Sequence, residues 1–187
     1  MFGRRLGTFF LDIIEVVVFA IAIFLFLYLL VLQPHKIKGA SMEPNFPNGE
    51  YLLTDKVTYR FREPERGDVI VFAAPPNESE EFIKRIIATP GEKISVVDGK
   101  VFINGKLLIE PYLAASIRTE SGAFFSDKGE IVVPQDRYVV FGDNRPFSSD
   151  SRSWGFITKK EITGRAWVIY WPLSKAGIVK ETVYSYN

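Results

Sequence analysis

The hydrophobic pattern divides the chain into one long apolar stretch near the N-terminus and a larger region of short apolar runs. Residues 16–32 (VVVFAIAIFLFLYLLVL) contain no charged side chain. As a helix rising about 1.5 Å per residue they would span roughly 25 Å, and extension back to Phe9 gives the length of a bilayer. The pattern therefore predicts a transmembrane anchor helix over residues 9–33, preceded by a short N-terminal segment over residues 1–8.

A cleaved secretory signal is the alternative for this stretch, with Arg4 and Arg5 as its positive start. The apolar core of such a signal should be only about 7 to 15 residues long and should end in small residues. Here the apolar stretch is longer and ends in VLQPHKIK, which favours a retained anchor. Lys36 and Lys38 follow the stretch, so positive charge at both ends leaves its orientation open.

Beyond Pro34 the pattern changes to short runs rich in Val, Ile, Phe and Tyr, which is typical of strands. Asp98-Gly99 and Asn104-Gly105 separate such runs at the spacing of two-residue hairpins, because both dipeptides tolerate positive φ angles. The clearest runs are Val69–Ala73, Phe82–Ala88, Ile94–Val97, Val101–Ile103, Ile131–Val133, Tyr138–Phe141 and Ala166–Trp171.

These runs predict a mostly β fold: a compact antiparallel β domain over residues 34–187, preceded by one transmembrane helix. The hairpins predict a small inserted region at about residues 94–130. Two polar stretches, residues 75–81 and 114–129, predict exposed loops.

Composition then removes several function classes. Charges nearly cancel, with 23 Lys and Arg against 22 Asp and Glu, so no basic surface favours nucleic-acid binding. Cysteine is absent and His35 is the single histidine, which excludes thiol catalysis, disulfides and any metal site with two imidazoles. The sequence predicts neither a metal nor another cofactor. His35 follows Pro34 at the predicted membrane exit, so we interpret it as an interfacial residue whose replacement by Ala is nearly silent.

Ser41 is the candidate nucleophile. It lies among small residues in GASMEP, ahead of two prolines, where a stiffened turn can present its hydroxyl and its backbone N–H to a carbonyl group, as acyl transfer requires. A serine in an ordinary turn is the alternative.

Lys84 is the candidate base, because it interrupts an apolar run. In a strand its side chain shares a face with Phe82 and Ile86 while Arg85 points the other way, so one of the two cations must face inward. Burial disfavours the charged form of an amine and lowers its pKa, which produces a neutral base. The alternative is a sheet edge from which the lysine reaches water. With histidine so scarce, a Ser-Lys pair is the natural way to activate a serine.

A third polar group follows the run that ends at Phe141, in residues 141–155 (FGDNRPFSSDSRSWG). Alternating charges in this segment predict a salt-bridge lattice that fixes the loop through Asp143, Asp150 and Arg152. Ser148 is a candidate to orient the lysine amine, because a base must be held in position to be effective.

Together these segments resemble the type I signal peptidases, and the resemblance covers most of the chain. Its motifs occur in order: the anchor, Ser-Met-Glu-Pro at Ser41, GDVIVF at residues 67–72, KRII at 84–87, PGE at 90–92, and GDNR at 142–145 with the residues up to Gly155. The resemblance implies that Ser41 is the nucleophile and Lys84 the general base, and that Ser148 hydrogen-bonds the lysine.

The resemblance also implies a substrate and a location. Such enzymes cleave signal peptides from exported preproteins after an Ala-x-Ala sequence, through an acyl-enzyme, with the catalytic domain outside the cell membrane and residues such as Arg4 and Arg5 in the cytoplasm. Substrate lies extended beside the strand that carries the lysine. The residues implied for its pockets are all apolar here: Ile37, Met42, Phe46, Phe82 and Ile83.

One departure from the family pattern affects the oxyanion hole. Some members carry a hydroxyl residue two positions before the nucleophile, where this chain has Gly39, so the hole would rest on the Ser41 backbone N–H; loss of one donor costs about 10²-fold. Two other functions stay open from the sequence. One is a membrane-tethered binding domain with an aromatic surface, and the other is a repressor-type Ser-Lys autoprotease, which the anchor and the lack of a DNA-binding module disfavour.

Overall fold

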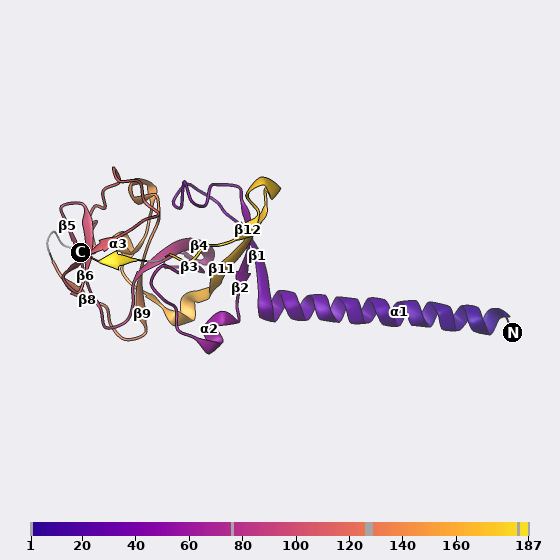
Figure 1. The fold of residues 1–187 in the computed structure, drawn as a ribbon. Helices are drawn as coiled ribbons and strands as arrows, with labels where there is room; N and C mark the ends of the chain where they lie inside the picture. Colours follow the sequence, from indigo (N-terminus) through magenta and orange to yellow (C-terminus); the bar gives the residue numbers. More distant parts are fainter. Residues whose placement is uncertain (1, 76, 126–128, 183, 187) are drawn as a thin grey trace.

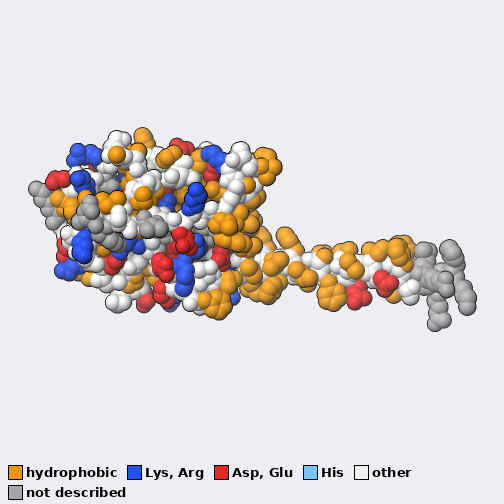
Figure 2. Space-filling view, in the orientation of Figure 1, with side chains coloured by type: hydrophobic (Ala, Val, Ile, Leu, Met, Phe, Trp, Pro, Cys, Tyr) orange, Lys and Arg blue, Asp and Glu red, His pale blue; other side chains and the backbone are white. Residues whose placement is uncertain are grey.

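The computed structural model describes residues 2–75, 77–125, 129–182 and 184–186, and consists of one long helix and two antiparallel sheets (Figure 1). Helix α1 (Phe2–Phe26) continues into the π-helical turn η1 (Leu27–Val31), and strand β1 (Leu32–Lys36) follows at once. The segment Gly7–Phe26 is long and apolar enough to cross a membrane, and none of it is buried. Figure 2 shows hydrophobic side chains along this helix and around the end of the β domain from which it emerges.

The larger sheet has the strand order β1-β2-β11-β3-β4-β9-β10, with β12 also paired to β11. Every pairing among the described residues of this sheet is antiparallel. Because four antiparallel steps separate β1 from β4, these two strands run in the same direction. The remaining strands are β2 (Tyr51–Asp55), β3 (Val69–Ala74), β4 (Asn77–Ala88), β9 (Arg137–Phe141), β10 (Ile157–Thr158), β11 (Ile162–Trp171) and β12 (Gly177–Ile178).

The smaller sheet has the order β13-β7-β6-β5-β8. Its two tight turns contain Asp98 and Asn104, each at φ 51°, followed by glycines that also have positive φ, as the sequence predicts. The strands are β5 (Lys93–Val97), β6 (Lys100–Ile103), β7 (Lys106–Ile109), β8 (Ile131–Val132) and β13 (Ser185–Tyr186). Short helical turns complete the fold: α2 (Thr58–Phe61), η2 (Arg145–Phe147), α3 (Ser151–Trp154), η3 (Lys159–Glu161) and η4 (Leu173–Lys175).

The predicted fold class, mostly antiparallel β with one N-terminal apolar helix, is confirmed, but both predicted loops need correction. Residues 77–81 belong to β4, whose exposed N-terminal half tolerates the polar side chains that suggested a loop. The described part of 114–129 has no helix or strand and is mostly exposed, as predicted, and the correction there concerns Phe125, which is fully buried against Phe141. Residues 126–128 of that predicted loop lie outside the described residues. The helical segment also ends at Val31 rather than at residue 33.

Strand β4 is covered on both faces, and this determines the environment of the site. Ile83, Ile86 and Ile87 belong to three different hydrophobic clusters. As a result Lys84 and Arg85 are both buried, with 3% and 4% of their surface exposed. The sequence predicts that one of the two cations faces inward, but both are buried, because both faces of the sheet are covered here.

Candidate active site

Ser41 lies in the connection between β1 and β2. The base of this connection is closed by two backbone hydrogen bonds just beyond the strands, from Ile37 N–H to the Glu50 carbonyl (2.8 Å) and from Gly49 N–H to the Ile37 carbonyl (2.9 Å). The chain after β9 holds its tip, because Asn144 donates its backbone N–H to the Ser41 carbonyl (2.9 Å) and its side-chain amide to the Ala40 carbonyl (2.9 Å). The serine is thus fixed by residues about 100 positions away in the sequence.

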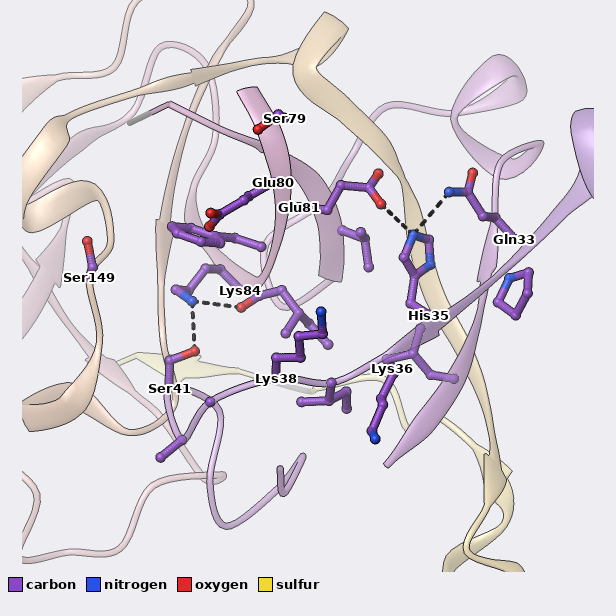
Figure 3. A pocket seen from close by; sticks show the side chains of 18 of the residues that line it. Gln33, His35, Lys36, Lys38, Ser41, Ser79, Glu80, Glu81, Lys84 and Ser149 are labelled. Atoms are coloured by element: carbon purple, nitrogen blue, oxygen red, sulfur yellow. Dashed lines mark hydrogen bonds and ion pairs between the residues drawn. The ribbon is translucent and has the colours of Figure 1, made fainter. Parts of the chain in front are cut away.

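Lys84 comes from β4 and meets this serine directly. Its Nζ lies 2.8 Å from Ser41 Oγ and 3.0 Å from the Ile83 carbonyl oxygen, and it lies 5.1 Å from the centre of the Phe82 ring (Figure 3). Burial lowers the pKa of Lys84 to about 8, although the negative charges of Asp150 and Asp143 oppose the shift. The structure therefore places a hydroxyl within hydrogen-bonding distance of an amine that is substantially neutral near pH 8.

A groove of about 910 Å³ extends from this pair. Its walls are the segment 33–41 on one side and residues 79–84 of β4 on the other, with Leu52 and Val71 also lining it. The N-terminal half of β4 pairs with β3 on one side, whereas β9 pairs with β4 only from Arg85 onward. A free strand edge therefore borders the groove, which is the arrangement that lets an extended peptide add to a sheet.

The five predicted pocket residues divide into two groups. Ile37, Phe82 and Ile83 line the groove. Met42 and Phe46 do not line it; they are buried with Ile37 and Leu52 in the hydrophobic cluster beside the groove. The Met42 sulfur also accepts a hydrogen bond from the Asp143 backbone N–H (3.4 Å). These two residues therefore support from within the core the loop that carries the candidate nucleophile Ser41, residues 37–50, called the nucleophile loop below.

The charged segment 141–155 supports the site through buried hydrogen bonds to β4 and to the loop that carries Ser41. Arg85 donates to both carboxylate oxygens of Asp143 (2.9 and 2.7 Å), and Asn45 donates to the same carboxylate (2.9 Å). Asp150 accepts from the side chain of Arg152 (2.8 Å twice) and from the Gly142 backbone N–H (3.0 Å). These three predicted charged residues are thus members of a buried lattice beneath the nucleophile loop.

Ser148 lies beside the site without the predicted contact. No hydrogen bond joins it to Lys84 among the described residues, and its buried Oγ has no partner there. It packs instead against Gly142, on the same side of this glycine as the Ser41 carbonyl oxygen. A buried hydroxyl without a partner is uncommon in folded proteins, so this oxygen is available to a group that approaches it during the reaction.

Gly142 is a functional position that the sequence reasoning missed. A Cβ atom added there would overlap both the Ser41 carbonyl oxygen and Ser148 Oγ. We expect Gly142→Ala to push the nucleophile loop away and to lower kcat by about 10²-fold, because misplacement by about 1 Å has that effect. Gly177→Ala is the matched control, since nothing lies within 4 Å of its added Cβ. Steady-state activity assays compare the two variants, and full activity of Gly142→Ala would show that the close contact is unimportant.

The backbone near Ser41 bears on the oxyanion hole. Gly39 has φ +86°, a conformation that favours glycine, and its N–H donates to Asn48 Oδ1 (3.1 Å). The Ser41 N–H donates no hydrogen bond to any described residue. This N–H is therefore free to receive a developing negative charge.

The chain is similar to proteins of one known family. The family model described as "Signal peptidase, peptidase S26" matches residues 10–171. A relative from Synechocystis sp., named probable signal peptidase I-2, is 39% identical over 81% of this chain and 68% of its own length. Signal peptidase IB from Staphylococcus aureus strain COL is 31% identical over 88% of this chain and 92% of its own length. The crystal structure of a signal peptidase I from Enterococcus faecalis V583 matches with a TM-score of 0.47 and 34% identity, over 56% of this chain and 97% of that one.

Proposed function

Since this chain belongs to the signal peptidase family, peptidase S26, and is a membrane-anchored serine endopeptidase that removes signal peptides, we propose that Ser41 and Lys84 perform the cleavage through an acyl-enzyme. The observation that carries the proposal is the 2.8 Å distance between Ser41 Oγ and the buried Lys84 Nζ. A nucleophile and its base within hydrogen-bonding distance are the minimum that covalent acyl transfer requires.

The proposed reaction has two steps that use the same amine. The neutral Lys84 accepts the proton of the Ser41 hydroxyl as the oxygen attacks the scissile carbonyl, while the Ser41 N–H stabilises the oxyanion. The amine then returns the proton to the leaving nitrogen and an acyl-enzyme forms. In the second step Lys84 removes a proton from water as the water oxygen attacks the ester carbonyl; the bond between that carbon and Ser41 Oγ then breaks, the amine returns the proton to Oγ, and the signal peptide leaves with a free carboxyl group. The unpartnered Ser148 hydroxyl orients the amine between these steps.

The groove supports a preference for small residues near the cut. Ile37, Phe82 and Ile83 give both walls of the groove apolar surface, which suits apolar side chains such as alanine. We therefore assign Ala-x-Ala as the preferred sequence, with preproteins that carry such a signal as the partners. A substrate series with Ala, Leu or Asp at the first and third positions before the cut tests this assignment. Equal cleavage of the Leu and Ala substrates would contradict it.

The location of the substrate supports one orientation of the chain in the membrane, with the β domain outside the cytoplasm. Signal peptides are removed from exported proteins, so the catalytic domain belongs on the extracytoplasmic face, with the N-terminal end of α1 in the cytoplasm. Exposed apolar side chains such as Leu173 (75%) and Ile178 (70%) lie on η4 and β12, and β12 pairs with β11 at the end of the β domain from which the anchor emerges (Figure 1). They suit contact with the lipid bilayer. Protease accessibility of the β domain in intact cells or inverted vesicles distinguishes the two orientations.

The decisive experiment is processing by the purified full chain in detergent. We expect it to cut a preprotein after Ala-x-Ala, with the new N-terminus identified by mass spectrometry. A trapped ester between Ser41 and the signal peptide, observed after rapid acid quenching, would identify the acyl-enzyme. Cleavage that persists without Ser41 would refute the proposed nucleophile.

The lowered pKa of Lys84 predicts the pH dependence of cleavage. The reaction needs the neutral amine, and that form becomes more abundant as the pH rises toward the Lys84 pKa of about 8. We therefore expect kcat/KM to rise about tenfold per pH unit below pH 8 and to level off above it. A profile that is flat from pH 5 to about pH 9 would contradict a lysine base.

A further inference from the structure

His35 and Glu81 form a second contact across the groove, away from the catalytic pair. His35 Nε2 lies 2.7 Å from Glu81 Oε2, as Figure 3 shows at the end of the groove remote from Ser41. A carboxylate only accepts hydrogen bonds, so His35 Nε2–H is the donor. The contact joins β1 to β4, two strands that are not neighbours in the sheet. It is therefore a bridge between the two groove walls rather than a pairing within the sheet.

Other strands hold both members of this bridge in place. His35 Nδ1 lies 2.8 Å from Thr54 Oγ1 on β2, and Glu81 Oε1 accepts from Thr163 Oγ1 on β11 (2.6 Å). The side chains are only partly exposed, at 15% for His35 and 34% for Glu81. Because a hydroxyl can either donate or accept, the Thr54 contact suits both the neutral and the protonated imidazole. The bridge is thus a built feature with partners on four strands.

Between the two contacts that join them, the two groove walls contain different lengths of chain. Among the described residues, hydrogen bonds join them at two places, His35 to Glu81 and Ser41 to Lys84. The two contacts are six residues apart on the first wall and three apart on β4, which correspond to about 20 Å and about 10 Å of extended chain. The longer wall must therefore bow away from β4 between the two contacts, and this stretch contains Gly39 at φ +86°. The groove is the space that this bow leaves open.

The bridge also lies at the end of the groove that faces the anchor. His35 belongs to β1, which begins directly after η1, whereas Ser41 lies beyond β1. A signal peptide has its apolar part in the bilayer, so the residues before the cut must pass from the lipid surface to Ser41. They reach the bridge before they reach the catalytic pair.

We propose that His35 and Glu81 are positioning residues for substrate: their bridge fixes the spacing of the groove walls at the anchor end and so favours an extended segment about four residues before the cut. An inserted strand needs about 4.8 Å on each side, more than directly paired walls would leave. End-to-end side chains hold the walls apart, and threonines on two further strands keep that spacing constant. The inference rests on the proposed function and deepens it, because it adds a second recognition region to the same groove.

The test compares two substrates that differ only in length before the cut. One is a full preprotein and the other a peptide that begins at the third residue before the cut. For the preprotein we expect His35→Ala and Glu81→Ala each to raise KM about tenfold with kcat changed less than about twofold, since the groove walls lose the spacing that the bridge fixes. For the short peptide both variants should stay within about twofold of the unaltered chain.

Three further variants separate positioning from a general structural effect. Glu81→Gln retains an acceptor for His35, so it should recover most of the lost affinity. The double variant should be no worse than either single variant, because the pair acts as a unit. Glu130→Gln breaks an ion pair with Lys93 outside the groove and should leave KM and kcat unchanged for both substrates. Cleavage by the unaltered chain and its loss in Ser41→Ala test the proposed function separately.

Several results would overturn the proposed positioning role of His35 and Glu81 while leaving the proposed enzyme function intact. Equal losses on the long and the short substrate would indicate a general structural role. An unchanged KM for the preprotein in both alanine variants would show that the anchor end of the groove does not select substrate. Multiplied losses in the double variant would show that the two side chains act independently.

Discussion

Replacement of Lys84 by methionine is expected to reduce signal-peptide cleavage by about 10⁴-fold or more, because losing one member of the proposed catalytic pair removes nearly all of its effect. Methionine fills a similar volume without an amine, so Ser41 keeps its surroundings but has no base. The folded state should not be weakened, since the buried cation that is lost was itself unfavourable. Single-turnover cleavage and thermal unfolding of the same preparation measure the two effects.

Matched variants make that expectation specific. Ser41→Ala should lose as much activity as Lys84→Met, and the double variant should be no worse, because the two residues act in one step. Lys100→Met removes an exposed lysine from β6 and should behave like the unaltered chain. Substantial cleavage by Lys84→Met would mean that another group, or water alone, takes the serine proton.

The second large effect is expected on stability, from the buried pair of Arg85 and Asp143. Asp143→Ala would leave the guanidinium of Arg85, only 4% exposed, with hydrogen bonds to the Gly67 carbonyl and Thr182 and no carboxylate. Removal of one partner of a buried ion pair costs about 3–5 kcal/mol of unfolding free energy. Chemical denaturation should show this loss as a lower midpoint, and activity should fall with it because Asn45 of the nucleophile loop also binds Asp143.

An exposed ion pair provides the control for this prediction. Lys93 and Glu130 lie 3.1 Å apart with 56% and 43% of their side chains exposed. Glu130→Ala should change the unfolding free energy by less than about 1 kcal/mol, because exposed pairs contribute little. If Asp143→Ala proved as mild as Glu130→Ala, the lattice beneath the nucleophile would not be the main support of this region.

The sequence predicts local features of this fold well, because their causes are local. The turns at Asp98-Gly99 and Asn104-Gly105 adopt the positive φ angles that their residue types allow. The apolar run that contains Lys84 is a strand, and the lysine faces inward as its strand neighbours suggest. The pairing of Ser41 with Lys84 followed from chemistry, since one histidine left few other ways to activate a serine.

Features that depend on distant contacts could not be predicted in this way. Strand β1 (LQPHK) has no alternating apolar pattern, and it exists because β2 pairs with it. The burial of Arg85 requires that both faces of β4 be covered, which no single run of residues reveals. His35 looked like a residue at the membrane surface, and only the folding of β1 toward β4 places it in the groove.

The junction between anchor and strand has a consequence for how the enzyme measures its substrates. No linker separates η1 from β1, and Lys56 N–H donates to the Val31 carbonyl (2.9 Å), so the helix end is fastened to the catalytic domain. If a flexible linker joined the anchor to the catalytic domain, Ser41 would sample many distances from the lipid surface. Here the anchor helix connects directly to β1, so this distance is fixed. We therefore expect the enzyme to select cleavage sites by their distance from the membrane. An otherwise suitable sequence that lies a few residues too near the bilayer or too far from it should not be cleaved.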